Sequence, residues 1–203
     1  MIRYPGWIKI CGLSSEEAVT TALELGVDAI GFVFAPSVRR ISISEAVRLA
    51  APARGRLACV AVFRHPSVAE VDEVLAGFAP DLVQTDHADG AYLPAAARSR
   101  LLPVYRESEA LPAEISGRLL FEGASSGSGR TADWEMARTL AARCELLLAG
   151  GLNPHNVAEA IRRVRPFGVD VSSGVESAPG VKSSQRIQEF VSAARAAYGE
   201  LSA

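Results

Sequence analysis

Eight short apolar runs, separated by stretches of helical periodicity, are the feature of this sequence that most limits how it folds. The runs are nearly continuous in hydrophobic residues, which is typical of parallel strands covered on both faces rather than of strands with one face in solvent. We therefore predict eight buried strands. They cover residues 7–10, 29–34, 57–63, 82–84, 101–105, 118–121, 145–149 and 168–171.

Helical spacing is clearest in five of the segments between these runs. Residues near the ends of the segments match capping patterns, in which a side-chain oxygen or a glycine satisfies exposed backbone groups. The stretches after the fourth and fifth runs are interrupted by prolines, so we expect the fourth and fifth helices to be short or replaced by loops. The helical segments are 14–25, 67–75, 133–142, 153–164 and 183–198, and the capping candidates are Ser14 with Glu17, Ser67 with Glu70, Asn153 before Pro154, and Gly26.

The number of strands and the chain length together favour one architecture. Eight strand–helix units in 203 residues average about 25 residues each, close to the lower size limit of a (β/α)8 barrel. We predict the α/β class and a single (β/α)8 TIM-barrel domain over residues 1–203. An open, doubly wound sheet is the competing arrangement, but it usually carries GxGxxG or GxxxxGKS/T after its first strand. Here Cys11-Gly12 stands at that place.

Composition excludes several classes of partner. Lys and Arg number 21 against 23 Asp and Glu, a net charge of −2, so the chain lacks the basic excess of nucleic-acid binding proteins. Charged residues interrupt every apolar run before the ~18 residues of a membrane span, and the N-terminus has no secretory pattern. Cys11, Cys59 and Cys144 are far apart without a CxxC pair, which excludes a zinc ribbon and predicts a cytoplasmic protein.

The loops after the seventh and eighth predicted strands are candidates for a phosphate site. In a (β/α)8 barrel the active site lies at the carboxyl ends of the strands, and these two loops commonly bind phosphate. Gly150 and Gly151 let backbone amides approach an anion just before a helix, and Ser172, Ser173 and Gly174 offer small side chains to the same place. Either loop alone could be a tight turn, but their joint occurrence favours a phosphorylated small molecule as the substrate.

Five motifs occur in order along the chain. They are KICGL at 9–13, GFVF at 31–34 followed by SVR at 37–39, AGGL at 149–152, DVSSGVE at 170–176, and Pro179 and Gly180 with Lys182. Together they resemble the phosphoribosylanthranilate isomerase family, over residues 9 to 182. The resemblance implies the (β/α)8 fold, no metal and no cofactor, and an Amadori rearrangement in tryptophan biosynthesis that converts an aminoaldose into an aminoketose.

The resemblance also implies roles for individual residues. Cys11 matches the general base of the family, a role that requires a thiol that can be deprotonated beside the sugar. Arg39 matches the residue that pairs with the anthranilate carboxylate, a planar anion suited to a guanidinium group, although Arg40 is adjacent and both could be solvated loop charges. Asp170 matches a position facing the ribose hydroxyls, or is a structural carboxylate.

Two stretches depart from the family pattern. The general acid is usually an aspartate after strand six, before a glycine-rich loop that ends in DW; here Glu122 stands at that strand end and the loop 123–132 is shorter. Glu122 can donate a proton if apolar surroundings raise its pKa, and Asp133, the rival carboxylate, is expected to cap a helix. At the end of strand four the family has a QLHG-like sequence, whereas this chain reads Gln84, Thr85, Asp86, His87.

Some assignments stay open at this point. Lys9 and Glu176 flank the first and eighth strands, so they are expected either to form a structural ion pair or to contact substrate. His65 and His155 lack metal-ligand spacing, and we predict no metal site. The chain is expected to be a monomer or a homodimer. Another sugar-phosphate isomerase or epimerase, or a phosphate-binding barrel without activity, are the alternatives to the isomerase.

Overall fold

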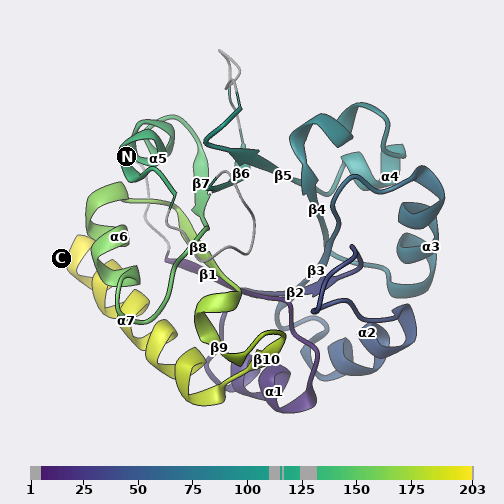
Figure 1. Cartoon of the computed structure of the whole chain (residues 1–203), viewed down its shortest axis with the longest axis horizontal. Coiled ribbons are helices and arrows are strands. Elements are labelled where there is room, and N and C mark those ends of the chain that lie inside the picture. The colour runs from purple at the N-terminus through teal and green to yellow at the C-terminus, as the bar shows by residue number, and fades with distance from the viewer. Residues whose placement is uncertain (1–5, 110–114, 116, 124–131, 203) are drawn as a thin grey trace.

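Eight parallel strands close into a barrel in the order of the chain (Figure 1). This computed structural model describes residues 6–109, 115, 117–123 and 132–202. The barrel closes between its first and last strands, with Lys9 opposite Asp170. The predicted barrel and all eight predicted strands are confirmed. The strands are β1 (Trp7–Cys11), β2 (Ala29–Val33), β3 (Ala58–Val62), β4 (Leu82–Asp86), β5 (Leu101–Arg106), β6 (Arg118–Glu122), β7 (Glu145–Leu148) and β8 (Gly168–Val171).

Helices cover the outside of the barrel, and the five predicted helices are present (Figure 1). α2 was not predicted, although Ser42 and Glu45 form a capping box at its start. Between β4 and β5 the helix is reduced to the four residues of α4, as the prolines predicted. The helices are α1 (Glu16–Glu24), α2 (Ile43–Ala50), α3 (Val68–Phe78), α4 (Ala95–Arg98), α5 (Trp134–Ala141), α6 (Val157–Val164) and α7 (Ser184–Ser202), with short 3-10 turns η1 (Ala51–Ala53), η2 (His87–Ala91) and η3 (Ser173–Val175).

The predicted helix ends are partly correct. The capping box of Ser67 and Glu70 is formed, and Gly26 follows α1 with φ +60°. Ser15, not Ser14, caps α1, because its side chain accepts from the Ala18 amide. The start predicted for α6 at Asn153 is also wrong: residues 153–156 form a turn before the helix, held by the Asn153 amide donating to Asn156 Oδ1 at 2.8 Å.

Two apolar layers explain why the strands are almost continuously hydrophobic. Alternate residues of each strand point outward and pack against the helices, as Ile8 and Ile10 do, both at most 1% exposed. The other residues fill the barrel interior. Toward the carboxyl ends of the strands this interior layer becomes charged. The apolar part of the interior consists of Leu102, Val104, Leu120, Leu147 and Ala149.

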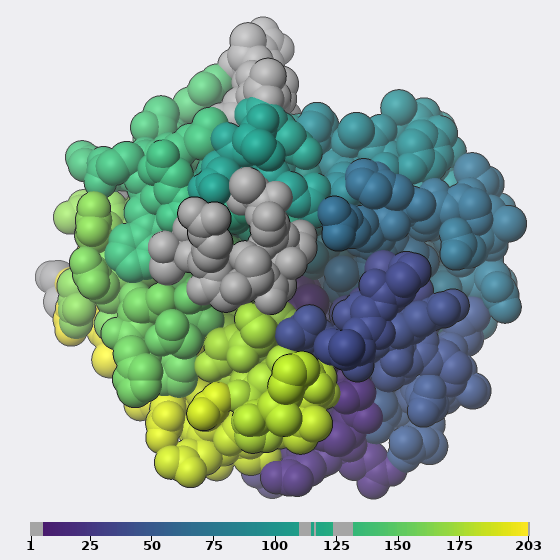
Figure 2. Space-filling view, viewed as in Figure 1, coloured from purple at the N-terminus to yellow at the C-terminus, as the bar shows by residue number. Residues whose placement is uncertain are grey.

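A small hairpin follows β8 and lies at the rim of the barrel near α1 (Figure 1). Its strands are β9 (Glu176–Ala178) and β10 (Val181–Lys182), which pair antiparallel. The hairpin lies against the loop after β2, as Figure 2 shows where the yellow-green and dark blue surfaces meet. Gly180 has φ +82°, and a Cβ there would lie only 2.9 Å from the Val38 carbonyl oxygen, so this contact requires glycine. Among the described residues, none of the helices combines the length and apolar character needed to cross a bilayer.

Candidate active site

Cys11 lies at the carboxyl end of β1 beside a buried ion pair. Lys9 shares the inward face of β1 with Cys11, and its Nζ lies 2.8 Å from Asp170 Oδ1 on β8. Lys9 is fully buried and the Asp170 side chain is 8% exposed. Gly31 on β2 leaves space for the sulfur, because a Cβ there would lie 3.1 Å from Cys11 Sγ. The Lys9–Asp170 pair therefore closes the barrel directly below the candidate base.

The charges around Cys11 determine its protonation. Burial raises the pKa of the Cys11 thiol above its usual value, and the nearby Lys9 and Lys182 ammonium groups only partly offset this effect. Burial also acts against the charge of Lys9, but Asp170 and Cys11 outweigh it and raise the pKa of Lys9. Cys11 is thus a thiol in the free protein at neutral pH, next to a lysine that remains charged.

Glu176 accepts three hydrogen bonds from two positively charged side chains. It accepts from Arg39 Nε at 2.6 Å and Nη2 at 2.9 Å, and from Lys182 Nζ at 2.7 Å. Burial acts against its ionisation, but the bonds from Arg39 and Lys182 outweigh burial and lower the pKa of Glu176 to about 2. The ion pair considered between Lys9 and Glu176 is therefore wrong, because each of them has a different partner.

Lys182 is a site residue that the sequence reasoning did not place. It is fully buried, and besides Glu176 it donates to the Ser172 carbonyl at 2.9 Å. Burial lowers the pKa of Lys182, with Glu176 acting in the opposite direction. The available signal was its place in the sequence, directly after the motif at 170–176 and next to Pro179 and Gly180.

The two candidate phosphate loops are in contact. Gly150 and Gly151 follow β7 with φ +83° and +65°, a conformation that favours glycine. Ser172 precedes η3, which contains Ser173 and Gly174. A Cβ on Gly174 would overlap the carbonyl oxygen of Leu152, so the eighth loop packs directly on the seventh. The two loops are therefore in contact, and their convergence on one anion stays a prediction.

Glu122 ends β6 beside the seventh loop. A Cβ on Gly150 would lie 3.6 Å from the Glu122 Cα, so the two segments are adjacent. Its side chain is 14% exposed, and Oε1 lies 3.0 Å from Arg106 Nη2. The apolar surroundings expected for this carboxyl are therefore wrong, because a guanidinium group contacts it. Asp133 caps α5 as predicted, accepting from the Glu135 and Met136 amides. Residues 124–131 of the loop after β6 lie outside the described residues.

These contacts form one continuous rim at the carboxyl ends of the strands. Glu122 adjoins Gly150, the seventh loop adjoins the eighth at Gly174, and the eighth loop reaches β1. At that last junction a Cβ on Gly12 would lie 3.2 Å from Ser172 Oγ. The structure thus brings together residues 11, 122, 150–151 and 170–174, which are distant in sequence. This rim contains both a thiol, Cys11, and a carboxyl group, Glu122.

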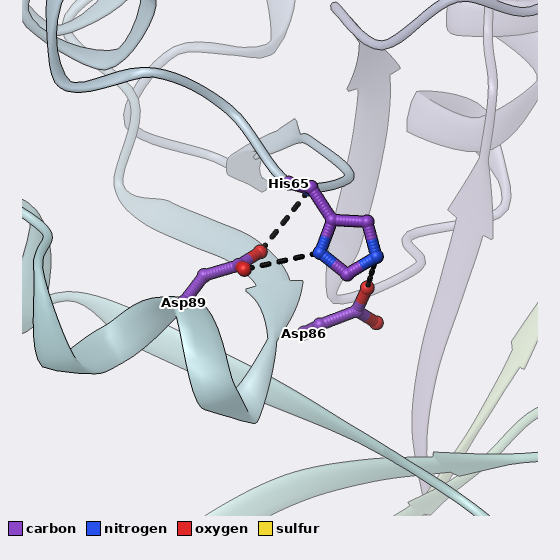
Figure 3. A group of neighbouring side chains, drawn as sticks. All are labelled: His65, Asp86 and Asp89. Atoms are coloured by element: carbon purple, nitrogen blue, oxygen red, sulfur yellow. Dashed lines mark hydrogen bonds and ion pairs between the residues drawn. The ribbon is translucent and has the colours of Figure 1, made fainter.

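A cluster of His65, Asp86 and Asp89 lies farther along the rim (Figure 3). His65 Nε2 is 3.1 Å from Asp86 Oδ2, and Nδ1 is 3.1 Å from Asp89 Oδ1. The three side chains are close enough to ligate one cation, but the imidazole points a different nitrogen at each carboxylate, and Arg106 already contacts Asp86. Sequence spacing did not reveal the cluster because His65 follows β3, whereas Asp86 and Asp89 lie at the end of β4 and in η2.

His87 is the first residue of η2, directly after β4. Its ring stacks on Tyr105, with centroids 4.3 Å apart, and its Nδ1 lies 3.2 Å from Glu109 Oε2. Asp86 is instead the residue of this stretch whose side chain faces the strand ends, through its contact with Arg106.

A cavity of about 540 Å³ opens between the loops that follow β2 and β3. Phe34, Phe63, Arg40 and His65 are among its lining residues, whereas Cys11 and Glu122 do not line it. The cavity therefore borders the His65 end of the rim and not its acid–base groups. The assignment of the site rests on the strand-end residues and their contacts.

Comparisons with known proteins agree with this geometry. The profile of the family described as N-(5'phosphoribosyl)anthranilate (PRA) isomerase matches residues 8–193. A curated relative from Roseiflexus castenholzii, named N-(5'-phosphoribosyl)anthranilate isomerase, is 41% identical, over 94% of this chain and 98% of its own. The crystal structure of phosphoribosyl anthranilate isomerase from Thermotoga maritima has 31% identity and a TM-score of 0.80, over 94% of this chain and 99% of that chain. A crystal structure of such an isomerase in complex with reduced 1-(o-carboxyphenylamino)-1-deoxyribulose 5-phosphate has 30% identity and a TM-score of 0.76, over 94% and 99% of the two chains.

Proposed function

This chain belongs to the N-(5'-phosphoribosyl)anthranilate isomerase family, and from that premise we propose which of its residues carry out the reaction. The enzyme converts N-(5'-phosphoribosyl)anthranilate into 1-(2-carboxyphenylamino)-1-deoxyribulose 5-phosphate in tryptophan biosynthesis. Substrate and product are isomers, so the protein has to open the furanose ring and move protons. A general acid and a general base meet this requirement.

Glu122 is the proposed acid. Its carboxyl group donates a proton to the furanose ring oxygen as the bond from that oxygen to C1 breaks. The electron pair of the anthranilate nitrogen forms the double bond to C1, which leaves an iminium ion. The proton at C2 becomes acidic because the iminium can accept the electrons of the C2–H bond. The position of Glu122 at the end of β6, on the rim, supports this role.

Cys11 is the proposed base. It removes the C2 proton, the electrons form an enolamine between C1 and C2, and tautomerisation yields the C2 ketone and a C1 methylene. Because burial raises the pKa of the Cys11 thiol, the free enzyme holds it protonated at neutral pH. The positive iminium, together with Lys9 and Lys182, favours loss of the thiol proton to solvent once the substrate has bound, and the resulting thiolate takes the C2 proton.

The remaining site residues bind the two ends of the substrate. We assign the phosphate to Gly150, Gly151, Ser172, Ser173 and Gly174, and the ribose hydroxyls to Asp170. Arg39 faces the anthranilate carboxylate. Its bonds to Glu176 use Nε and one hydrogen of Nη2, so the edge carrying Nη1 can bind a second carboxylate while Glu176 holds the first.

The observation that carries this assignment is the continuous rim, which joins Cys11 on β1 to Glu122 on β6 through the two touching loops. The test follows the fluorescence decay of phosphoribosylanthranilate with wild type, Cys11→Ser and Glu122→Gln. We expect each variant to lose about 10²–10⁴-fold in kcat, the usual contribution of a positioned acid or base.

Asp133→Asn is the matched control for Glu122→Gln. It makes the same acid-to-amide change at the rival carboxylate, and asparagine still caps α5, so wild-type kcat is expected. Comparable rates in wild type, Cys11→Ser and Glu122→Gln would remove both assignments. An inactive wild type would favour a phosphate-binding barrel without activity.

We further propose that residues 1–203 form a single domain that acts in the cytoplasm as a monomer or homodimer. The three cysteines, none in a disulfide, are compatible with a reducing compartment. The reaction is proposed to need no metal or organic cofactor, since side chains supply both proton-transfer groups. Light scattering of the purified chain gives the oligomeric state, and activity after treatment with a chelator tests the metal.

A further inference from the structure

Arg106 connects the two places at which this sequence departs from the family pattern. Arg106 and Glu122 are opposite each other in the pairing of β5 and β6. Arg106 Nη2 lies 3.0 Å from Glu122 Oε1, and its Nη1 contacts Asp86 Oδ1 at the end of β4. One guanidinium group therefore bridges the proposed acid and a carboxylate from two strands away.

The bridge is largely shielded from solvent. The side chains of Arg106 and Asp86 are 12% and 4% exposed, so salt screens their interaction far less than that of a surface pair. Burial acts against the charge of Arg106, but the hydrogen bond that Arg106 donates to Asp86 and the charge of Glu122 outweigh burial and raise the pKa of Arg106. Arg106 therefore remains positively charged between two carboxyl groups.

Asp86 also contacts the imidazole ring of His65 (Figure 3). His65 Nε2 lies 3.1 Å from Asp86 Oδ2, and the other ring nitrogen contacts Asp89. Asp89 is anchored by hydrogen bonds from Thr85 and Tyr92. We name His65, Asp86, Arg106 and Glu122 the rim ion chain, in which each member contacts the next.

We propose that Arg106 and Asp86 are positioning residues for the general acid: Arg106 orients the Glu122 carboxyl group, and Asp86 partly offsets the charge that Arg106 places beside it. The inference rests on the proposed function, because it takes Glu122 as the acid. A lone arginine beside Glu122 would favour the carboxylate and disable it. Asp86 weakens that effect, and the guanidinium group, which contacts Asp86 through Nη1 and Glu122 through Nη2, still fixes the geometry.

Other charged groups face the chain from neighbouring segments. Glu109 Oε1 lies 3.8 Å from Arg106 Nη1, and His87 contacts Glu109. The Glu107 amide donates to the Glu122 carbonyl, and the Glu107 side chain bonds the Asp133 amide. The seventh loop brings the uncharged residues 149–151 to the other side of Glu122. Several carboxyl groups thus lie near Arg106. Removal of Asp86 makes the surroundings of Glu122 more positive, whereas removal of Arg106 makes them more negative.

The test titrates the Glu122 carboxyl carbon by ¹³C NMR, with its resonance assigned by loss in Glu122→Gln, and measures kcat and KM in parallel. In Asp86→Asn the loss of one carboxylate beside Arg106 should move the midpoint about 1 pH unit lower and reduce kcat about tenfold. In Arg106→Met the midpoint should move about 1 pH unit higher. Arg106→Lys keeps the charge but loses the fork, so we expect a midpoint near wild type with kcat reduced about tenfold and KM unchanged.

Asp72→Asn and Arg98→Met make the same chemical changes at exposed positions and should leave midpoint and kcat as in wild type. Midpoints that do not move, or that move in the same direction in Asp86→Asn and Arg106→Met, overturn the inference. If circular dichroism shows that Asp86→Asn is unfolded, the two Arg106 variants decide it alone. An active Glu122→Gln would instead contradict the proposed acid, so the two failures are distinguishable.

Discussion

Glu176 shows how a single residue organises the mouth of the barrel. Its carboxylate accepts from Arg39, Lys182 and the Gly180 amide, which links the loop after β2 to the β9–β10 hairpin. Its side chain is only 5% exposed. The loss of this carboxylate would leave Lys182 buried without its charge partner and free the hairpin from Arg39.

We predict that Glu176 makes stability pH-dependent at low pH. Its pKa is lowered from 4.5 to about 2, so its stabilisation is present above pH 4.5 and is lost as the pH falls toward 2. This shift corresponds to about 3 kcal/mol. In Glu176→Gln, the decrease in unfolding free energy between pH 6 and pH 2 should be smaller by about that amount, measured by urea denaturation. Glu24→Gln, an exposed carboxyl group on α1, is the control. Equal decreases in wild type and Glu176→Gln would contradict the prediction.

At the scale of elements, the packing of one loop on another creates the proposed phosphate site. The seventh and eighth loops touch because Gly174 has no side chain. Each loop offers backbone amides and small side chains, but only their contact directs both toward one anion.

Gly174→Ala should therefore impair substrate binding. Its Cβ would overlap the Leu152 carbonyl oxygen and push the loops apart, so we expect KM to rise about tenfold or more, equivalent to ~1.4 kcal/mol, with a smaller change in kcat. Gly199→Ala in α7 is the matched control, since no atom lies within 4 Å of its added Cβ. It should leave KM unchanged and raise the unfolding free energy by up to ~1 kcal/mol. An unchanged KM in Gly174→Ala would contradict a role for the contact between the two loops in binding the phosphate.

For the whole molecule, the Lys9–Asp170 pair closes the barrel between residues 161 positions apart. Removal of one member leaves a charge uncompensated in the interior, so Asp170→Asn should lower the unfolding free energy by about 3–5 kcal/mol. Arg162→Met, which breaks an ion pair about half exposed on both sides, should cost at most ~1 kcal/mol. Guanidinium denaturation compares the two variants, and similar losses would show that the buried pair contributes no more to closure than a surface pair.

The sequence predicted the features that depend on residues close together in the chain better than those that depend on tertiary contacts. The strands were predictable because burial of both faces makes each of them a continuous apolar run. The capping box of Ser67 and Glu70 was predictable because its two residues are only three positions apart. The cap of α1 shifted from Ser14 to Ser15, and α6 began later than Asn153, because neighbouring loop contacts select between adjacent polar residues. The motifs indicated Cys11, Arg39 and the two loops. The place of Lys182 in the site became evident only from its contacts with Ser172 and Glu176 in the folded structure.

Local pattern and chain length were thus sufficient for the eight strands, the barrel and the positions of the loops at its mouth. The partners of the charges followed from closure and register instead: Lys9 pairs with Asp170 rather than Glu176, and Arg106 bridges Asp86 and Glu122. The physical reason is that hydrophobic burial repeats along the chain with the period of each element, whereas a charge pairs with whatever the closed barrel places within a few ångströms, a distance unrelated to separation in sequence.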